Sequence, residues 1–244
     1  MRKVIYLEIA DSLRRMIESG RYGEGQVLPS EAMLGKLHGA SRVTIRKALE
    51  ELRSDGLIES RQGFGWMVAA EPFPQSLDAL VSIERQLADS GRASEREIVD
   101  FEFVDSPPQV ASVLGPRVLE VARVNLADGQ PFARVTVWCR EDLGADLSQA
   151  QVARSSFHDL LPVELKTATQ TIGADLMSEA DAGLLGVPPG SAALVVRRTT
   201  FADDGEPILM SELWFPGHLT EFVAELSPAQ VDDTGSGLRL VGEG

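Results

Sequence analysis

The 244-residue sequence contains one cysteine, three histidines and no long apolar run. A lone cysteine cannot form an internal disulfide, so Cys139 indicates a reducing compartment such as the cytoplasm. No stretch approaches the roughly 20 apolar residues that a membrane-spanning helix needs, and the N-terminus lacks the apolar segment of a signal peptide. We therefore expect a cytoplasmic protein that has no membrane partner.

Motifs that hold metals or cofactors are also missing. The residues His38, His158 and His218 show no metal-ligand spacing with one another or with Cys139. The glycine pair in the segment 63–65 is not followed by a helical pattern, which excludes a dinucleotide-binding loop. A Walker sequence and a nucleophile elbow are absent as well. The sequence predicts no cofactor, no metal site and no catalytic activity.

The net charge of −14 is distributed unevenly along the chain. Residues 1–68 contain 11 basic and 9 acidic side chains, a net charge of +2, whereas the remainder contains 12 basic and 28 acidic ones, a net charge of −16. An acidic body repels a phosphate backbone, so any contact with nucleic acid must come from the N-terminal part.

The N-terminal part shows three helical patterns followed by two short strands. Residues 5–19 carry apolar side chains at helical spacing. Ser30 and Ser41 are N-cap candidates for two further helices, and the last of these runs to about residue 55. A glycine-rich tip at 63–65 joins the two strands. Two helices joined by a short turn and followed by a hairpin are typical of a winged helix-turn-helix.

Basic and hydroxyl side chains gather at the start of the third helix and in the hairpin. A recognition helix presents its N-terminal turn to the major groove, where arginine offers two parallel donors that match guanine. Glycines at the hairpin tip let the backbone approach a narrow minor groove. The residues predicted to bind double-stranded DNA are Ser30, Ser41, Arg42, Thr44, Arg46, Lys47, Arg61, Gln62 and Gly63.

The C-terminal part contains an internal repeat whose two copies lie about 71–76 residues apart. Each copy reads as a helix, a strand, an Asp-Gly turn and a second strand that ends at Trp138 or Trp214. The turns Asp128-Gly129 and Asp204-Gly205 are typical of type I′ hairpins, in which both central residues take positive φ. Two such hairpins in one antiparallel sheet, with helices on a face, predict an α+β domain.

These patterns divide the chain into two domains. We place the winged helix-turn-helix at residues 1–69 and a linker, which contains prolines, at 70–75. The antiparallel-sheet α+β domain then occupies residues 76–244.

Four segments of the N-terminal domain are specific in combination: Leu28-Pro29-Ser30-Glu31, Ser41 to Leu49, Asp55-Gly56-Leu57-Ile58 and Arg61-Gln62-Gly63-Phe64-Gly65. They resemble the N-terminal domain of GntR-family bacterial transcription regulators. The resemblance implies that Arg42 and Arg46 contact bases or phosphates in the major groove, that Thr44 binds a phosphate and that Gly63 approaches the minor groove. Family members often carry arginine where this chain has Ala32, which suggests a divergent operator.

The second domain resembles the UTRA effector-binding domain of the HutC subfamily, which shares its fold with chorismate lyase. The resemblance rests on the order Leu-Gly, Arg and Asp-Gly-x-Pro and covers about residues 76–225. It implies contacts to a small-molecule effector from Ser82, Arg123, Ser156 and His158, with histidine replacing a tyrosine of the family.

The same residues predict an anionic effector. An inward-facing Arg123, the hydroxyls of Ser82 and Ser156, and a helix N-terminus near Ser156 form an anion site. Glutamates that sugar-phosphate-binding relatives place on the second strand of each hairpin are missing here. This absence favours a smaller or more apolar anion, such as a phosphonate, a phosphate ester or an organic acid.

Together these features predict a homodimeric repressor that binds a near-palindromic operator and responds to a small anion. Two alternatives remain open at this point. The C-terminal domain is an enzyme of the chorismate-lyase type, or it is an inert dimerisation domain attached to a DNA-binding head. In the latter case Arg123 pairs with an acidic neighbour and His158 is an ordinary residue at a helix start.

Overall fold

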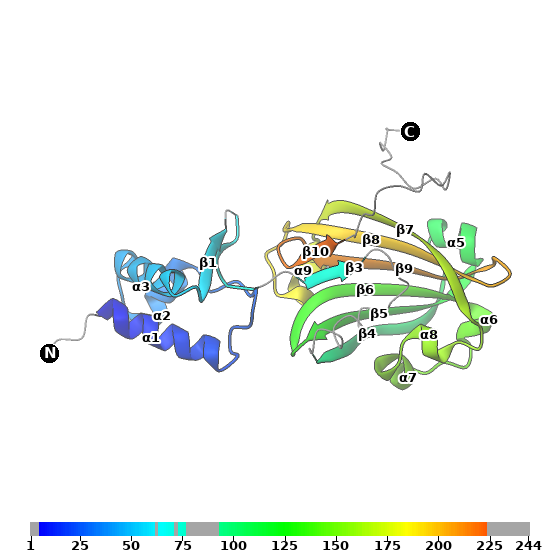
Figure 1. Cartoon of the computed structure of the whole chain (residues 1–244), viewed down its shortest axis with the longest axis horizontal. Coiled ribbons are helices and arrows are strands. Elements are labelled where there is room, and N and C mark those ends of the chain that lie inside the picture. The colour runs from blue at the N-terminus through cyan, green and yellow to red at the C-terminus, as the bar shows by residue number, and fades with distance from the viewer. Residues whose placement is uncertain (1–4, 62, 71–72, 77–92, 224–244) are drawn as a thin grey trace, which may run out of the picture.

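The computed structural model describes residues 5–61, 63–70, 73–76 and 93–223. A mainly helical N-terminal domain and a larger sheet domain lie side by side along the long axis of the molecule (Figure 1). The predicted combination of a winged helix-turn-helix and an antiparallel-sheet α+β domain is therefore confirmed.

The N-terminal domain contains α1 (Ile5–Glu18), α2 (Glu31–His38), α3 (Arg42–Ser54), β1 (Ile58–Arg61) and β2 (Gly65–Val68). Both predicted serine caps are formed. The Ser30 hydroxyl accepts a hydrogen bond from the amide of Met33 at 3.3 Å, and the Ser41 hydroxyl accepts one from Thr44 at 3.2 Å. Gly39 ends α2 in the left-handed conformation, which glycine adopts without a steric penalty.

The core of this domain is formed by the stripe of α3 that the sequence pattern predicts. Ile45, Leu49 and Leu52 are fully buried against Leu13 of α1 and Leu34 of α2. Because these apolar side chains take up one side of α3, its remaining positions are left for solvent or a partner.

The second domain is built on a six-stranded antiparallel sheet with the order β4-β5-β6-β9-β8-β7. Its strands are β4 (Ser94–Asp105), β5 (Arg117–Ala127), β6 (Gln130–Arg140), β7 (Leu165–Leu176), β8 (Ala192–Ala202) and β9 (Pro207–Pro216). The two predicted hairpins, β5–β6 and β8–β9, meet along β6 and β9 in the middle of the sheet (Figure 1).

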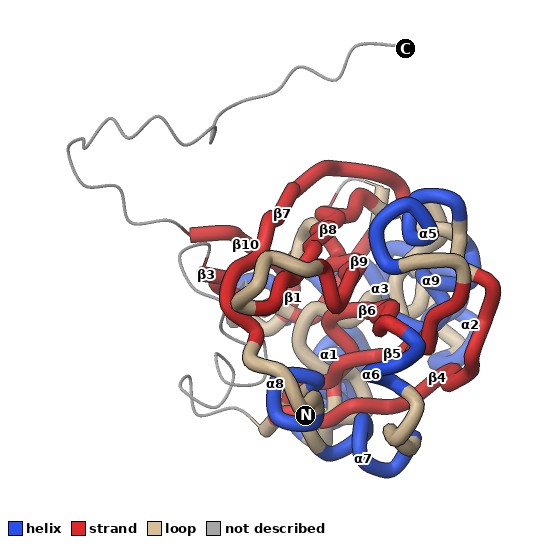
Figure 2. Tube along the Cα trace, turned by 90° about the vertical axis from the view of Figure 1, so that its right-hand side faces the viewer, coloured by secondary structure: helices blue, strands red, loops and turns tan. Residues whose placement is uncertain are grey.

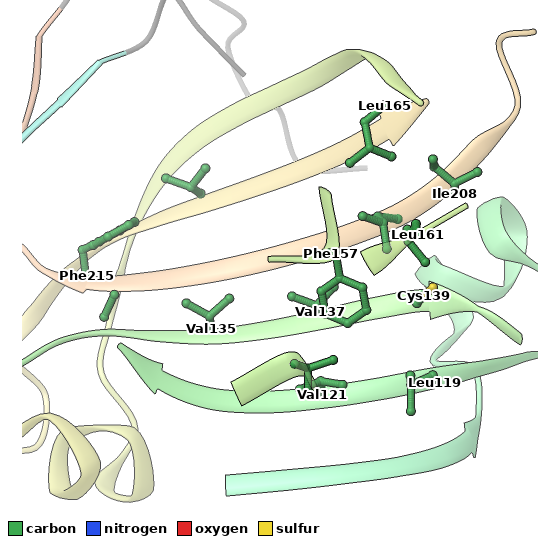
Figure 3. Packing of buried hydrophobic residues seen from close by; sticks show 14 of the residues in the cluster. Leu119, Val121, Val135, Val137, Cys139, Phe157, Leu161, Leu165, Ile208 and Phe215 are labelled. Carbon is green, nitrogen blue, oxygen red and sulfur yellow. The ribbon is translucent and has the colours of Figure 1, made fainter. Parts of the chain in front are cut away.

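Helices cover both faces of this sheet. The first face packs against α7 (Gln149–Arg154) and α8 (Phe157–Leu160), and we call it the α8 face. The opposite face packs against α5 (Pro108–Leu114) and α9 (Glu179–Leu185), and we call it the α9 face. A short helix, α6 (Glu141–Gly144), follows β6. Figure 3 shows the apolar core of the α8 face, in which Phe157 of α8 lies over Val121 and Val137.

The two Asp-Gly turns differ in conformation. Asp128 has φ +51° and Gly129 has φ +76°, so the first turn takes the positive φ values expected of type I′. In the second turn, only Gly205 takes positive φ, so the type I′ prediction is wrong there. Asp204 instead uses its carboxylate to accept a hydrogen bond from the amide of Glu206 at 3.0 Å.

Part of the predicted linker forms a strand. The segment β3 (Phe73–Ser76) pairs in parallel with β10 (Thr220–Val223), and Figures 1 and 2 show the two strands side by side. Two prolines suggested irregular structure, but a two-stranded edge tolerates proline because the missing amide donor can face away from the partner strand. The segment that leaves the first domain is thus paired with β10, the last described strand of the second domain.

Candidate functional site

The first turn of α3 presents a group of exposed polar side chains. The Ser41 and Thr44 hydroxyls lie 2.8 Å apart, so both are held at the N-terminus of the helix. The side chain of Arg42 is 80% exposed, and Arg46 and Lys47 are exposed as well. The structure therefore brings together the predicted contacts of this helix on a surface that a phosphate backbone can reach.

Glu31 connects this surface to the rest of the domain. Its carboxylate accepts a hydrogen bond from Arg42 Nε at 2.6 Å and one from Trp66 Nε1 at 3.4 Å. The bond from Arg42 lowers the pKa of the Glu31 carboxyl, which opposes the effect of burial. Glu31 thus links α2 to the start of α3 and to β2, a strand of the hairpin β1–β2 that forms the wing.

Sequence reasoning missed one exposed residue of α3, Val43. Its side chain is 68% exposed although it is apolar, and it stands between Arg42 and Thr44. An apolar side chain at this place can contact the methyl group of thymine in the major groove. The sequence did contain a signal for an exposed Val43, because this residue falls outside the apolar stripe that Ile45 and Leu49 form along α3.

The wing lies close to the second domain. Gly63 has φ +87°, which places it at the predicted hairpin tip, and Gln62 lies outside the described residues. Arg61 forms an ion pair with Glu59 at 2.7 Å, and its Nη1 donates to the His218 carbonyl at 3.4 Å. The Phe64 ring lies 5.0 Å from the His218 ring. In this arrangement the guanidinium of Arg61 faces protein rather than solvent alone.

Glycines permit a close approach between the two domains. A Cβ atom on Gly23 would lie 2.0 Å from the Gln130 side chain, and one on Gly25 would lie 2.2 Å from Leu219. A hollow of about 320 Å³ opens beside this contact, and its lining includes Tyr22 from the first domain and Phe132 from the second. The β5–β6 turn therefore touches the DNA-binding domain directly.

Arg123 and Asn125 occupy the α8 face of β5. Val124, which lies between them, belongs to the core of the opposite face. Val121, two positions before Arg123, belongs to the core of the α8 face. Arg123 is 8% exposed and Asn125 is 1% exposed. Neither polar atom of the Asn125 amide has a hydrogen-bond partner among the residues that the structure describes. A buried amide without partners costs about 1–3 kcal/mol, which a bound ligand can recover.

Asn125 was not among the predicted effector contacts. Its signal in the sequence is a polar side chain two positions after Arg123, in a strand whose last residues are otherwise apolar. Alternation along a strand puts residues two positions apart on the same face. Only the register shows that this face is buried, so the residue could not be selected from the pattern alone.

The structure supports Ser156 and His158 less well. The Ser156 hydroxyl donates to the Asp159 carboxylate at 2.6 Å, and α8 contains only four residues. The helix begins directly after Ser156 as expected, but this carboxylate puts negative charge at its start, which disfavours an anion there. His158 is exposed, whereas Phe157 beside it is buried. Ser82 lies outside the described residues.

Metal and nucleophile chemistry finds no support in the described part of the chain. No group of three or more histidine, cysteine, aspartate or glutamate side chains gathers there in a metal-binding arrangement. Cys139 is buried, and burial raises the pKa of its thiol to about 12, which keeps it protonated at neutral pH. None of the described helices is long and apolar enough to cross a membrane.

Comparisons with protein families match both domains. Residues 5–68 match the model of bacterial regulatory proteins of the gntR family, and residues 89–220 match the UTRA domain. The chain belongs to the GntR family and carries a UTRA domain. It is a DNA-binding transcription regulator, and the resemblance drawn from the sequence motifs is confirmed.

Named relatives extend over most of this GntR-family chain. It is 26% identical to the HTH-type transcriptional repressor NagR of Bacillus subtilis, covering 90% of this chain and 93% of NagR. Over 64% of its own length, this chain is 31% identical to MngR of Escherichia coli, the repressor of a mannosyl-D-glycerate transport and metabolism system. These relatives are regulators rather than enzymes, which agrees with the expected absence of catalysis.

The fold is also that of solved family members. The crystal structure of PhnF from Mycobacterium smegmatis superimposes with a TM-score of 0.60 at 23% identity, over 91% of this chain and 100% of PhnF. YydK from Bacillus subtilis gives a TM-score of 0.55 at 21% identity. At these identities the likeness establishes the fold alone.

Proposed function

We propose that this GntR-family protein is a homodimeric repressor that binds a near-palindromic operator and is released or reoriented by a small anionic metabolite. A phosphonate, a phosphate ester and an organic acid are the effector classes that fit. The observation that carries this proposal is the buried pair Arg123 and Asn125 on the α8 face.

The DNA-binding half of the proposal rests on the start of α3. Arg42, Arg46 and Lys47 supply positive charge at the exposed end of this helix, where Ser41 and Thr44 add hydroxyl donors. Val43 adds an apolar contact. Base edges are then read by the arginines and Val43, and phosphates are contacted by the hydroxyls and Lys47. Two such heads require two half-sites related by two-fold symmetry.

The dimer is supported by the exposed edge of the sheet. Among the described strands, β7 pairs with β8 alone in the six-stranded sheet, and its Ile172 and Leu176 side chains are exposed. An edge strand with exposed apolar side chains is a surface on which another copy can pair.

Communication between effector and operator is supported by the β5–β6 hairpin. The strand that carries Arg123 and Asn125 ends at Ala127, and the turn that follows touches the loop between α1 and α2. An anion that changes the placement of this hairpin also changes the preferred placement of the DNA-binding domain. The effect is limited to the difference in anion affinity between the two arrangements.

A thermal-shift titration of the full chain tests the effector proposal. The probes are inorganic phosphate, methylphosphonate and acetate, applied to the wild type, to Arg123→Gln and to the control Arg117→Gln. Arg117 lies on the same strand but is exposed and pairs with Glu141. We expect saturable stabilisation of the wild type and the control by at least one anion, and its loss in Arg123→Gln.

Two outcomes contradict the proposal. A wild type that responds to none of these anions indicates an inert dimerisation domain. Equal loss of the response in Arg117→Gln and Arg123→Gln indicates screening of surface charge rather than a site.

A further inference from the structure

A second arginine, Arg198 of β8, lies on the α8 face. Arg198 stands opposite Ser211 of β9, Ser211 opposite Val137 of β6, and Val137 opposite Val121 of β5. Directly opposed residues in antiparallel strands share a face. Val121 and Val137 belong to the core of the α8 face, so Arg198 points to the same side of the sheet as Arg123.

Among the described residues, the hydrogen-bond partner of Arg198 is a neutral side chain. Its Nε and Nη2 atoms donate to the Gln170 side-chain oxygen at 2.8 and 2.6 Å, and no carboxylate of the described chain forms an ion pair with it. The residue is partly buried, and burial lowers the pKa of its guanidinium. Its neighbour Arg197, on the other face, is more exposed and has Glu212 at 2.7 Å.

The internal repeat places Arg123 and Arg198 in equivalent positions. Arg123 faces Val135 across the first hairpin, and Arg198 faces Ser211 across the second. The strands β6 and β9 separate the two arginines, which gives three strand steps or about 14 Å across the sheet. Between them, the α8 face carries the apolar side chains of Val135 and Leu213 and the hydroxyl of Ser211.

The presence of two arginines on one face of the sheet indicates the kind of effector. We infer that the effector is a diacid, with one acid group held at Arg123 and Asn125 and the other at Arg198, joined by a largely apolar spacer over β6 and β9. A partly buried cation that bonds only to an amide among the described residues is costly without a counter-charge, and the second acid group supplies one. A compact anion such as phosphate contacts only one of the two arginines.

The inference rests on the proposed function, and a ligand series separates the two. The probes are straight-chain dicarboxylates of four to ten carbons and monocarboxylates of equal length. Each is titrated into the full-length protein while thermal shift and binding heat are recorded. We expect one dicarboxylate length to bind about 10- to 100-fold more tightly than its matched monocarboxylate, the range given by one charge-assisted contact.

Three variants locate the second acid group. Arg198→Gln removes the cation, and it should abolish the advantage of the dicarboxylate while leaving the monocarboxylate response unchanged. Gln170→Glu keeps the size of the side chain but gives Arg198 a permanent counter-charge, so it should also abolish the advantage without destabilising the fold. Arg197→Gln, the neighbour on the opposite face, is the control and should retain the advantage.

The outcomes distinguish the two ideas. A wild type with no preference for any dicarboxylate, or a preference that survives in Arg198→Gln, overturns the diacid inference. Dissociation of the ligand-free dimer by Arg198→Gln assigns this arginine to a subunit contact and also overturns it. Arg123→Gln should remove the response to both acids. If both responses persist in Arg123→Gln, the proposed effector site is wrong, whatever Arg198→Gln shows.

Discussion

The two domains place the side chains of their proposed sites in opposite ways. In the DNA-binding domain the core is apolar, and Arg42, Arg46 and Lys47 stand outside it in solvent. In the UTRA domain the two arginines of the proposed effector site lie on a sheet face, where Arg123 is buried and Arg198 is partly buried. A large polymeric anion requires an exposed surface, whereas a small anion requires a site that removes it from water.

This difference also explains what could be predicted from the sequence. Helical spacing separates buried from exposed positions of α3 within one short segment, so the cap Ser41 and the basic residues after it could be placed without a structure. The proposed effector site of the UTRA domain depends on which strands are neighbours in the sheet. Asn125 and Arg198 come from strands far apart in sequence, and only the register places them on one face.

Other details depended on packing that no local pattern encodes. The contact of the wing with His218 joins residues that are 157 positions apart. The predicted effector contact of Ser156 competes with a local bond, because its hydroxyl donates to Asp159 three residues later. The serine pattern predicts a donor to a ligand, and it does not reveal that a neighbouring carboxylate is also available as an acceptor.

The largest expected effect is a loss of stability in one domain that leaves the stability of the other unchanged. Leu49 is fully buried in the core of the DNA-binding domain. Leu49→Ala should destabilise that domain by about 2–5 kcal/mol through lost burial and a cavity. Calorimetry should show one transition lowered and the UTRA transition unchanged. A single transition that shifts as a whole would show that the two domains unfold together.

A smaller effect is expected at the contact between the domains. Gly25 has φ +71°, and a Cβ there would lie 2.2 Å from Leu219. Gly25→Ala should therefore cost about 1–3 kcal/mol of strain and weaken the docking of the domains. Small-angle scattering should report a more extended molecule, with Gly20→Ala as a control, because Gly20 shares positive φ but has open space around it. Identical scattering profiles for both variants would contradict a specific contact at Gly25.

The smallest effect is a dependence on pH at His218. Burial lowers the pKa of this imidazole below its ordinary value of 6.5, and the charge of Arg61 lowers it further. The unfolded chain then binds the proton more readily, so this contribution to stability is complete above pH 6.5 and is lost as pH falls through the lowered pKa. His218→Gln should flatten the dependence of the melting temperature between pH 7.5 and 5. An unchanged slope would show that other groups control it.

The most direct test of the division between the domains is a DNA titration with Arg46→Ala. The probe is double-stranded DNA selected by the full-length protein, and the control is Arg53→Ala, which removes the same charge from the other end of α3, where Arg53 pairs with Glu50. Loss of one base contact costs about 1–3 kcal/mol, so Arg46→Ala should bind about 5- to 150-fold more weakly while Arg53→Ala stays close to the wild type. Equal affinities for Arg46→Ala and the wild type would contradict the placement of the DNA-reading surface at the start of α3.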